Sequence, residues 1–227
     1  MPKHLATIQL DTGADTTASV IWMHGLGASA TDFAGMPQEL DLHGLDPIRF
    51  IFPYAPVRPV TANNGYAMPA WYDFLHFGFD EGEEGREDES TIRASQALIE
   101  QLIEQEVTRG IAPERIVIAG FSQGCVMTLQ TGLRYPKKLG GLMCLSGYLA
   151  LPHKLAEERS EASKDTPIFM VHGRGDPIIP IQYSVHSRDF LTRLGYQIEW
   201  HDYNMQHAVC PEEIGHIGAW LRRVLAW

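Results

Sequence analysis

The sequence predicts an α/β fold in which a mainly parallel central sheet is covered by helices on both faces. Short apolar segments of strand character alternate with longer segments of helical periodicity, an order that is typical of parallel sheets. A glycine-rich turn at residues 120–124 joins one such strand directly to a helix. The length of 227 residues suits one domain, 1–227, with a substantial core.

The predicted strands are short runs rich in apolar and β-branched residues. They lie at residues 5–10, 19–23, 48–52, 116–119, 141–145, 167–172 and 197–203. We expect the first of them at an edge of the sheet, and Pro53 ends the third. Helices are predicted at residues 31–40, 90–107, 125–135, 181–194 and 211–225, whereas residues 147–165 are weakly patterned.

Two of these helices carry clear boundary signals. The helix at residues 90–107 has one apolar face and ends at Arg109-Gly110, a basic last turn followed by a glycine. The last helix begins near Pro211 and has Glu212 and Glu213 in its first turn, where acidic side chains are favourable. Both segments are therefore predicted with defined ends.

A long excursion separates the third strand from the helix at residues 90–107. Residues 54–89 contain three prolines and many aromatic side chains, and a loop of this length in a compact domain is usually functional. Its end, residues 80–89, holds seven acids and one arginine and so carries −6 of the net charge of −10. We expect a mobile surface loop here, because such a charge run is best solvated. No metal site is expected in it, because the acids lack the ligand-and-glycine register of a calcium loop.

Composition excludes several classes of protein. The acidity is mostly local and leaves no basic stripe, so no nucleic-acid partner is expected. The N-terminus lacks the apolar region of a signal peptide, and no run approaches membrane-spanning length. Three sparse cysteines, Cys125, Cys144 and Cys210, form neither a disulfide framework nor a metal-binding spacing. We therefore expect a cytoplasmic protein without stable membrane insertion.

The turn at residues 120–124 has the pattern G-x-S-x-G and the surroundings that this motif needs. A strand precedes it, a helix follows it, and the strained serine turn requires small neighbours, which Gly120 and Gly124 are. Such a turn lifts the Ser122 hydroxyl above the edge of the sheet. The Gln123 amide, at the helix N-terminus, then points toward charge developing on a substrate oxygen. Ser122 is the candidate nucleophile.

A serine nucleophile needs a histidine to take its proton. Of the histidines that follow a plausible acid, only His207 lies in a loop leaving the carboxyl end of a predicted strand, where sites of α/β proteins gather. The others fall within predicted helices or a strand; they are His186, His201 and His216. His207 is therefore the candidate base.

The histidine in turn needs a carboxylate to orient it. Asp176 directly follows the strand at residues 167–172 and is the favoured acid, with Asp202, at the end of the last strand, as the alternative. A second donor for the oxyanion is expected from residues 24–28, because the glycines there let the backbone approach a ligand. His24 itself is expected to brace that loop.

With these residues in place, nearly the whole chain resembles the bacterial carboxylesterase and acyl-protein thioesterase (phospholipase/carboxylesterase) family of α/β-hydrolases. The matching segments are residues 20–28, 63–73, 119–124, 145–148 and 214–221. The resemblance implies Ser122, Asp176 and His207 as catalytic triad and the amides of Leu26 and Gln123 as oxyanion hole. It also places residues 54–89 beside the acyl chain, with Met68 and Trp71 as candidate substrate-binding residues.

The resemblance further implies hydrolysis of short- to medium-chain carboxylic esters, and of thioesters or lysophospholipids as further substrates. No cofactor and no metal is expected, nor a large cap domain, and such enzymes often form homodimers. The chain departs from the family pattern at Cys125, at Gln206 and in the length of its acidic run. Gln206 is expected to narrow the mouth of the site near His207.

Two classes of function fit these residues. The favoured one is a serine carboxylesterase that works through an acyl-Ser122 intermediate on a small-molecule ester or thioester. The alternative is a non-catalytic protein of the same fold that binds a small ligand. Within the enzyme class, lactonase or peptidase activity remains open, because fold and triad do not determine which bond is cleaved.

Overall fold

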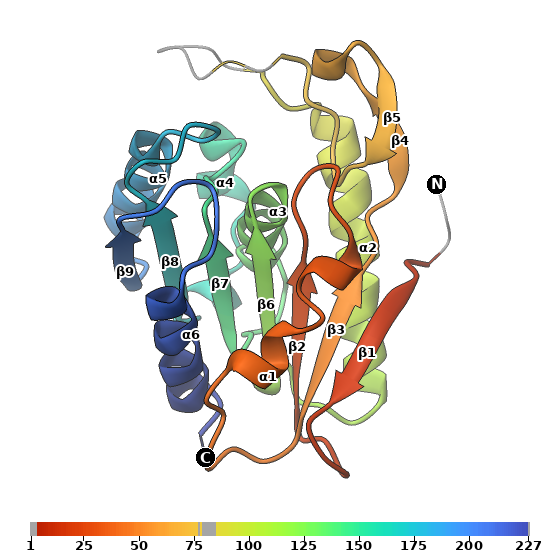
Figure 1. Cartoon of the computed structure of the whole chain (residues 1–227), viewed down its shortest axis with the longest axis vertical. Helices are drawn as coiled ribbons and strands as arrows, with labels where there is room; N and C mark the ends of the chain where they lie inside the picture. Colours follow the sequence, from red (N-terminus) through yellow and green to blue (C-terminus); the bar gives the residue numbers. More distant parts are fainter. Residues whose placement is uncertain (1–3, 77, 79–84, 227) are drawn as a thin grey trace.

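A seven-stranded sheet forms the centre of the molecule (Figure 1). The structure is a computed structural model that describes residues 4–76, 78 and 85–226. The strand order is β1-β3-β2-β6-β7-β8-β9; β1 pairs antiparallel with β3 and all other pairs are parallel. The strands are β1 (Thr7–Asp11), β2 (Ala18–Met23), β3 (Ile48–Pro53), β6 (Ile116–Phe121), β7 (Gly141–Leu145), β8 (Ile168–Gly173) and β9 (Ile198–Tyr203).

Helices cover both faces of this sheet, as an α/β fold requires. The α-helices are α1 (Met36–Glu39), α2 (Glu89–Thr108), α3 (Gln123–Gly132), α4 (Pro152–Glu158), α5 (Ile181–Arg193) and α6 (Pro211–Val224). One apolar core joins the sheet to α2, α3 and α5, and a second joins it to α1 and α6. Figure 1 shows α1 and α6 on the near face, with α2 and α3 behind the strands.

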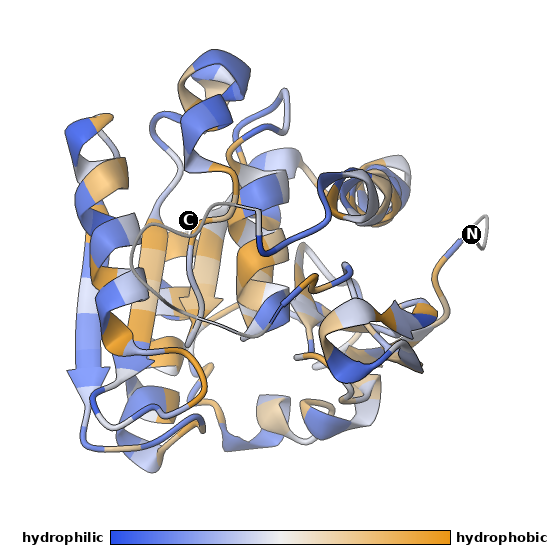
Figure 2. Cartoon of the chain, turned by 90° about the horizontal axis from the view of Figure 1, so that it is seen from above, coloured by the Kyte–Doolittle hydropathy of each residue, from blue (hydrophilic) through white to orange (hydrophobic). Residues whose placement is uncertain are grey.

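The alternation of apolar side chains explains why both faces are buried. Along β2, Val20 and Trp22 enter the core under α1 and α6, whereas Ile21 and Met23 enter the core under α2 and α3. The central strands β2 and β6 are therefore buried along nearly their whole length and are mostly apolar, as Figure 2 shows by their colour. The edge strand β9 is only half-buried along most of its length.

Two segments differ from the sequence-based expectation. Within residues 54–89 the chain forms an antiparallel hairpin of β4 (Val57–Val60) and β5 (Tyr66–Pro69). The sequence pattern does not predict these strands, because prolines are uncommon within strands. The helix expected at residues 31–40 is broken into a 3₁₀ turn at Ala30–Asp32 and the short α1, because Gly35 and Pro37 interrupt it. None of the helices in the described ranges is long and apolar enough to cross a membrane.

The mobile loop expected at residues 80–89 is ordered at its carboxyl-terminal end, while residues 80–84 lie outside the described residues. Glu87 is 2.5 Å from the Tyr148 hydroxyl that donates to it. Asp88 caps α2 by accepting from the Thr91 amide at 2.8 Å, and Glu89 is the first residue of that helix. These acids are held in place because each has a specific partner or position in the helix.

Parallel strands bring their carboxyl ends to one edge of the sheet. The loops that follow β2, β6, β8 and β9 therefore meet there, and they carry residues 24–28, Ser122, Asp176 and His207 respectively. The Gly27 amide also donates to the Pro69 carbonyl at 2.8 Å, so the β4–β5 hairpin contacts the loops at the same edge.

The first turn of α6 contains a buried carboxyl group, Glu213, with which we predict a pH-dependent stability. Neither of its oxygens has a hydrogen-bond partner within the described residues, and burial raises its pKa from 4.5 to about 8 although the nearby Cys210 amide opposes this. Between those two values the folded protein binds more protons than the unfolded chain. Stability should therefore fall as pH rises, by up to about 1.4 kcal/mol per pH unit.

Glu213→Gln removes the ionisable group and should flatten this dependence. Urea unfolding at pH 5.5 and pH 8.5 measures it: the variant should gain several kcal/mol over the unmodified protein at the higher pH only. The exposed neighbour Glu212 provides the matched control, Glu212→Gln. Parallel pH dependence of the unmodified protein and Glu213→Gln would show that Glu213 is not the group responsible.

Candidate active site

Ser122 occupies a strained turn between β6 and α3. Its backbone has φ 56° and ψ −117°, a left-handed conformation that is costly for a residue with a side chain. The Ser122 amide donates to the Leu145 carbonyl at 2.9 Å, and the Cys125 amide donates to the Ser122 carbonyl at 3.0 Å. Hydrogen bonds to β7 and α3 therefore hold the turn, and the Ser122 side chain stays at the sheet edge.

The two glycines of the motif are required by close approach of the backbone. A Cβ atom on Gly120 would lie 2.1 Å from the Gly124 carbonyl oxygen, and one on Gly124 would lie 2.5 Å from the Met23 carbonyl oxygen. Neither contact can be relieved by moving a flexible side chain. The G-x-S-x-G spacing thus lets the helix start directly above the neighbouring strand β2.

The structure brings Asp176 and His207 together. His207 Nδ1 lies 2.6 Å from Asp176 Oδ2, and the Asp176 side chain is fully buried whereas that of His207 is 16% exposed. The other carboxylate oxygen, Oδ1, accepts from the amides of Ile178 at 2.8 Å and Ile179 at 2.9 Å. Asp176 is thereby locked in one orientation, and the exposed edge of the imidazole faces outward.

The electrostatics of Asp176 involve a residue that the sequence did not reveal, the buried His172. Burial alone would raise the pKa of Asp176, but hydrogen bonds from His172, His207 and the Ile179 amide outweigh it and hold the pKa well below its usual range. His172 Nε2 is 2.8 Å from the Ile179 carbonyl oxygen and 3.3 Å from Asp176 Oδ2. A carbonyl only accepts, so Nε2 carries a proton that both oxygens share.

Asp202, the alternative acid, has other partners. Its carboxylate forms an ion pair with Arg174 at 2.5 Å and accepts from the Trp200 indole at 3.2 Å. Its side chain is 35% exposed. The geometry therefore favours Asp176 as the residue that orients His207.

The loop after β2 lies against Ser122. A Cβ atom on Gly25 would be 3.3 Å from Ser122 Cβ, and Leu26 lines the same cavity as Ser122. His24 braces the loop: its Nε2 accepts from the Ala55 amide at 3.1 Å, and Nδ1 lies 2.7 Å from the Gly25 carbonyl oxygen. These partners require the neutral ring, and burial accordingly lowers the pKa of His24.

The backbone amide and the side chain of Gln123 have different roles. Its amide is the first of α3 and has no acceptor within the helix, because the first N–H groups of a helix never do. Its side chain accepts from the Trp71 amide at 2.7 Å and donates to the Tyr72 carbonyl at 2.8 Å. The side chain thus fixes residues 71–72 while the amide stays available for a ligand.

Trp71 and Met68 do not occupy the position expected of substrate-binding residues. Trp71 is completely buried, and its indole donates to the His24 carbonyl at 2.8 Å behind the loop. The Met68 sulfur would lie 3.4 Å from a Cβ atom on Gly27. Neither is among the described residues that line the cavity containing Ser122. Trp71 thus lies in the core behind residues 24–28, whereas Met68 is half-buried beside Gly27, and a role of either in substrate binding stays a prediction.

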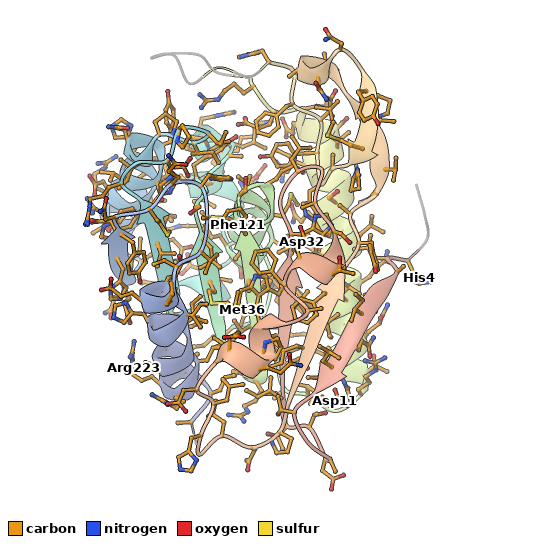
Figure 3. The ribbon with its side chains drawn as sticks, viewed as in Figure 1. His4, Asp11, Asp32, Met36, Phe121 and Arg223 are labelled. Carbon is orange, nitrogen blue, oxygen red and sulfur yellow. The ribbon has the colours of Figure 1, made fainter. Side chains whose placement is uncertain are left out.

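The cavity above Ser122 has a volume of about 860 Å³ and mostly apolar walls. We name it the Ser122 cavity; its lining includes Phe33, Phe74, Phe121, Ile178, Ile179 and His207. Figure 3 labels Phe121 at the carboxyl end of β6, and its ring lies 4.7 Å from the His207 ring. Ser122 and His207 both line this cavity, although no hydrogen bond joins their side chains within the described residues.

Two departures from the family pattern have simple explanations. Cys125 is fully buried and fits because residue 147 is glycine, where a Cβ atom would lie 2.5 Å from Cys125 Cβ. Gln206 is exposed and is not among the described residues lining the Ser122 cavity, so it does not narrow its mouth. No group of three or more potential metal-ligating side chains occurs within the described ranges.

The sheet order, the strained serine turn and the loops at one sheet edge define an α/β-hydrolase. The model of the phospholipase/carboxylesterase family matches residues 6–225, and the chain belongs to this family. Family membership makes the chain a hydrolase.

Similar proteins span the same length. Acyl-protein thioesterase 1 of the fungus Gibberella zeae is 38% identical over 226 residues, covering 97% of this chain and 96% of its own. The protein of that name from Neurospora crassa is 43% identical over 206 residues, covering 88% and 84%. The crystal structure of Arabidopsis thaliana SOBER1 superposes with a TM-score of 0.86 at 32% identity, covering 92% of this chain and 99% of SOBER1.

Proposed function

We propose that this protein is a serine esterase that hydrolyses short- to medium-chain carboxylic esters and thioesters through an acyl-Ser122 intermediate. The observation that supports this proposal most is the relative placement of Ser122, His207 and Asp176. Ser122 is held in a strained turn at the edge of a cavity that His207 also lines, and the buried Asp176 carboxylate lies 2.6 Å from the far nitrogen of that histidine.

In the acylation step His207 Nε2 takes the proton of the Ser122 hydroxyl while Oγ attacks the carbonyl carbon of the ester. The carboxylate of Asp176 fixes the imidazole with its proton on Nδ1, leaves Nε2 free to accept, and stabilises the imidazolium that forms. The missing Ser122–His207 hydrogen bond is compatible with this role, because such contacts often tighten only when substrate is bound.

The tetrahedral intermediate carries negative charge on the former carbonyl oxygen. We assign the amides of Leu26 and Gln123 as its donors, since the first borders the Ser122 cavity and the second begins α3 without an acceptor. Collapse of the intermediate expels the alcohol or thiol, which takes the proton from His207. Water then attacks the acyl-enzyme with His207 as base, releases the carboxylic acid and restores Ser122.

The acyl group is proposed to bind along the apolar wall of the Ser122 cavity. Ile178 lines this wall while its side chain remains largely exposed, at 59%, so a ligand there would remove apolar surface from water. The names of the fungal relatives suggest a thioester as substrate, and an acyl-Ser122 intermediate serves either leaving group.

We predict that kcat/KM rises over the first few acyl carbons and then falls for long chains, because each buried methylene contributes up to about 0.8 kcal/mol until the wall ends. Ile178→Ala should lower kcat/KM for the hexanoyl ester several-fold while changing that for the acetyl ester little. A p-nitrophenyl ester series measures both, and a thioester series of the same acyl groups compares the leaving groups.

Val57→Ala is the matched control, because Val57 is also an exposed branched aliphatic residue, at 71%, but lies on β4 away from the described lining of the Ser122 cavity. Its chain-length profile should equal that of the unmodified protein. If Ile178→Ala and Val57→Ala gave the same profile, the acyl group would have to bind elsewhere. A protein that cleaved no member of either series would contradict the proposed function.

A further inference from the structure

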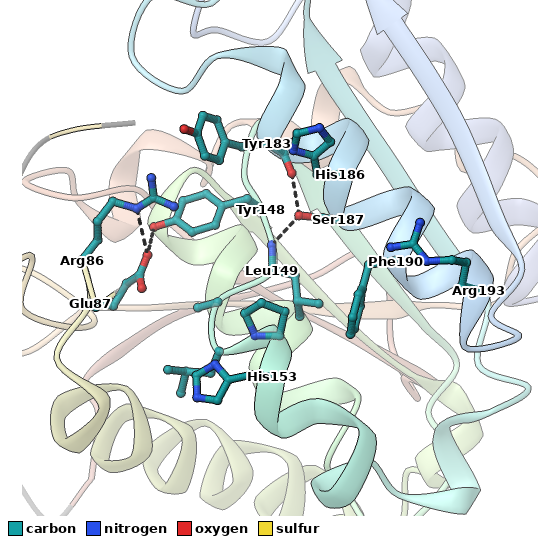
Figure 4. A pocket seen from close by; sticks show the side chains of 14 residues that line it. Arg86, Glu87, Tyr148, Leu149, His153, Tyr183, His186, Ser187, Phe190 and Arg193 are labelled. Carbon is teal, nitrogen blue, oxygen red and sulfur yellow. Dashed lines mark hydrogen bonds and ion pairs between the residues drawn. The ribbon is translucent and has the colours of Figure 1, made fainter. Parts of the chain in front are cut away.

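A second cavity lies beside α5 and is separate from the Ser122 cavity (Figure 4). Its volume is about 300 Å³, at the lower end of the range for small-molecule sites. Its walls come from α5, from the segment after β7 and from residues 85–87. No described residue lines both cavities, so a ligand in the second cavity would not occupy the place of an ester at Ser122.

The inner wall of the second cavity is apolar and fixed. Tyr148 and Leu149 are buried, and the ring of Phe190 faces the space from α5. The Ser187 hydroxyl accepts from the Leu149 amide at 2.8 Å and donates to the Tyr183 carbonyl at 2.6 Å, which ties this wall to the helix. The cavity is therefore preformed and offers an alkyl or aromatic group a surface that loses water on contact.

The charge of the second cavity is opposite to that of the protein. Glu87 is the one acid among its described lining residues, and it is satisfied by Arg86 at 3.8 Å and by the Tyr148 hydroxyl. Arg86 also lies over the Tyr183 ring at 4.8 Å. Besides this neutralised pair the lining contains one arginine, Arg193, and two histidines, whereas the chain as a whole carries −10 with its histidines counted as neutral.

The three basic side chains have no acceptor of their own. His153, His186 and Arg193 have neither a hydrogen bond nor an ion pair within the described residues, and all three are exposed at the rim. Figure 4 shows these three side chains spread around Leu149 and Phe190, with Tyr148 to one side. Arg193 also lies over the Phe190 ring, 5.9 Å from its centroid. An anionic group at the rim would find N–H donors that make no hydrogen bond within the described residues, and its apolar tail would reach the inner wall.

We propose that the second cavity binds a small amphipathic anion, an alkyl chain with a carboxylate or phosphate head. The tail packs against Tyr148 and Phe190, and the head meets the guanidinium of Arg193, with His153 and His186 as further donors along the rim. This site goes beyond the proposed function and does not depend on it. A medium-chain carboxylate is also the kind of product that ester hydrolysis would release.

Isothermal titration of the full-length protein with octanoate, octyl phosphate and octanol tests this binding. We expect both anions to bind and the neutral alcohol to bind at least about tenfold more weakly, and the better of the two anions identifies the head group. Arg193→Gln removes a charge at the rim and should weaken anion binding about three- to tenfold. The double variant H153Q/H186Q removes two ring N–H donors and should weaken it by a similar factor. Higher salt should weaken it further.

Two controls assign the site. Arg188→Gln makes the same charge change on the same helix, but Arg188 pairs with Asp189 and stacks on Trp200 away from the second cavity, so affinity should not change. Ile178→Ala alters the Ser122 cavity, where the acyl group of a substrate is proposed to bind, so the part of octanoate binding that Arg193→Gln weakens should persist in this variant. Melting temperatures confirm that the exposed substitutions leave the fold intact. Absence of anion binding, equal binding of octanol, equal effects of Arg193→Gln and Arg188→Gln, or loss of binding in Ile178→Ala would each overturn the proposal.

Discussion

Ser122→Ala should abolish ester hydrolysis while leaving the protein folded. The change removes the attacking oxygen, and triad members act as a unit, so we expect kcat to fall on the order of 10⁴- to 10⁶-fold. The backbone at residue 122 is strained by its positive φ, and this strain is the same with serine or alanine at that position. The free energy of unfolding should therefore change little. Steady-state hydrolysis of p-nitrophenyl butyrate and a thermal melt measure the two effects separately.

The cysteines provide controls for this result. Cys125 is buried beneath the turn and Cys210 precedes α6, and neither lines the described part of the Ser122 cavity. Cys210→Ala and Cys125→Ala should each keep most of the activity in folded protein. Near-normal activity in Ser122→Ala, or a folded but inactive cysteine variant, would require a different nucleophile.

Asp176→Asn should produce the second largest loss. An amide in place of the carboxylate can donate to His207 Nδ1 and would favour the wrong tautomer of the ring, which costs on the order of 10⁴-fold in kcat. The loss should appear in kcat more than in KM, because Asp176 is buried under the histidine and does not itself line the described part of the Ser122 cavity. Steady-state kinetics on one short ester resolve the two constants.

Asp202→Asn makes the same chemical change at the carboxylate that holds Arg174. Because its partners lie away from His207, activity should stay within a few-fold of normal. The opposite ranking of the two variants would assign the orienting role to Asp202.

The sheet was predictable because its signals are local. Most core strands are predominantly apolar runs bounded by turn residues, as at residues 116–119, and these runs appear as β-strands of the sheet. The β4–β5 hairpin was missed because it is short, contains Pro59 and Pro69, and forms through pairing that no local pattern encodes. Gly35 likewise divides a segment whose composition alone suggested one helix.

The positions of the candidate site residues were predictable where they depend only on which strand each residue follows. Ser122, Asp176 and His207 each follow a strand, and parallel strands end at one edge. The role of His172 could not be found this way, because it depends on a 3.3 Å contact within a tight loop. The buried position of Trp71 could not be predicted either, since an aromatic residue in a long loop can pack into the core or contact a ligand, and the sequence does not distinguish the two.

Covalent labelling tests the central claim, an acyl-forming Ser122, most directly. The protein is treated with a fluorophosphonate ester, and intact-mass measurement followed by peptide mapping counts and locates the adduct. We predict one adduct per chain, on the peptide that contains Ser122, with loss of esterase activity in proportion to labelling and with no labelling of Ser122→Ala. Folded protein that takes up no label, or that takes it up on another residue, would contradict the account.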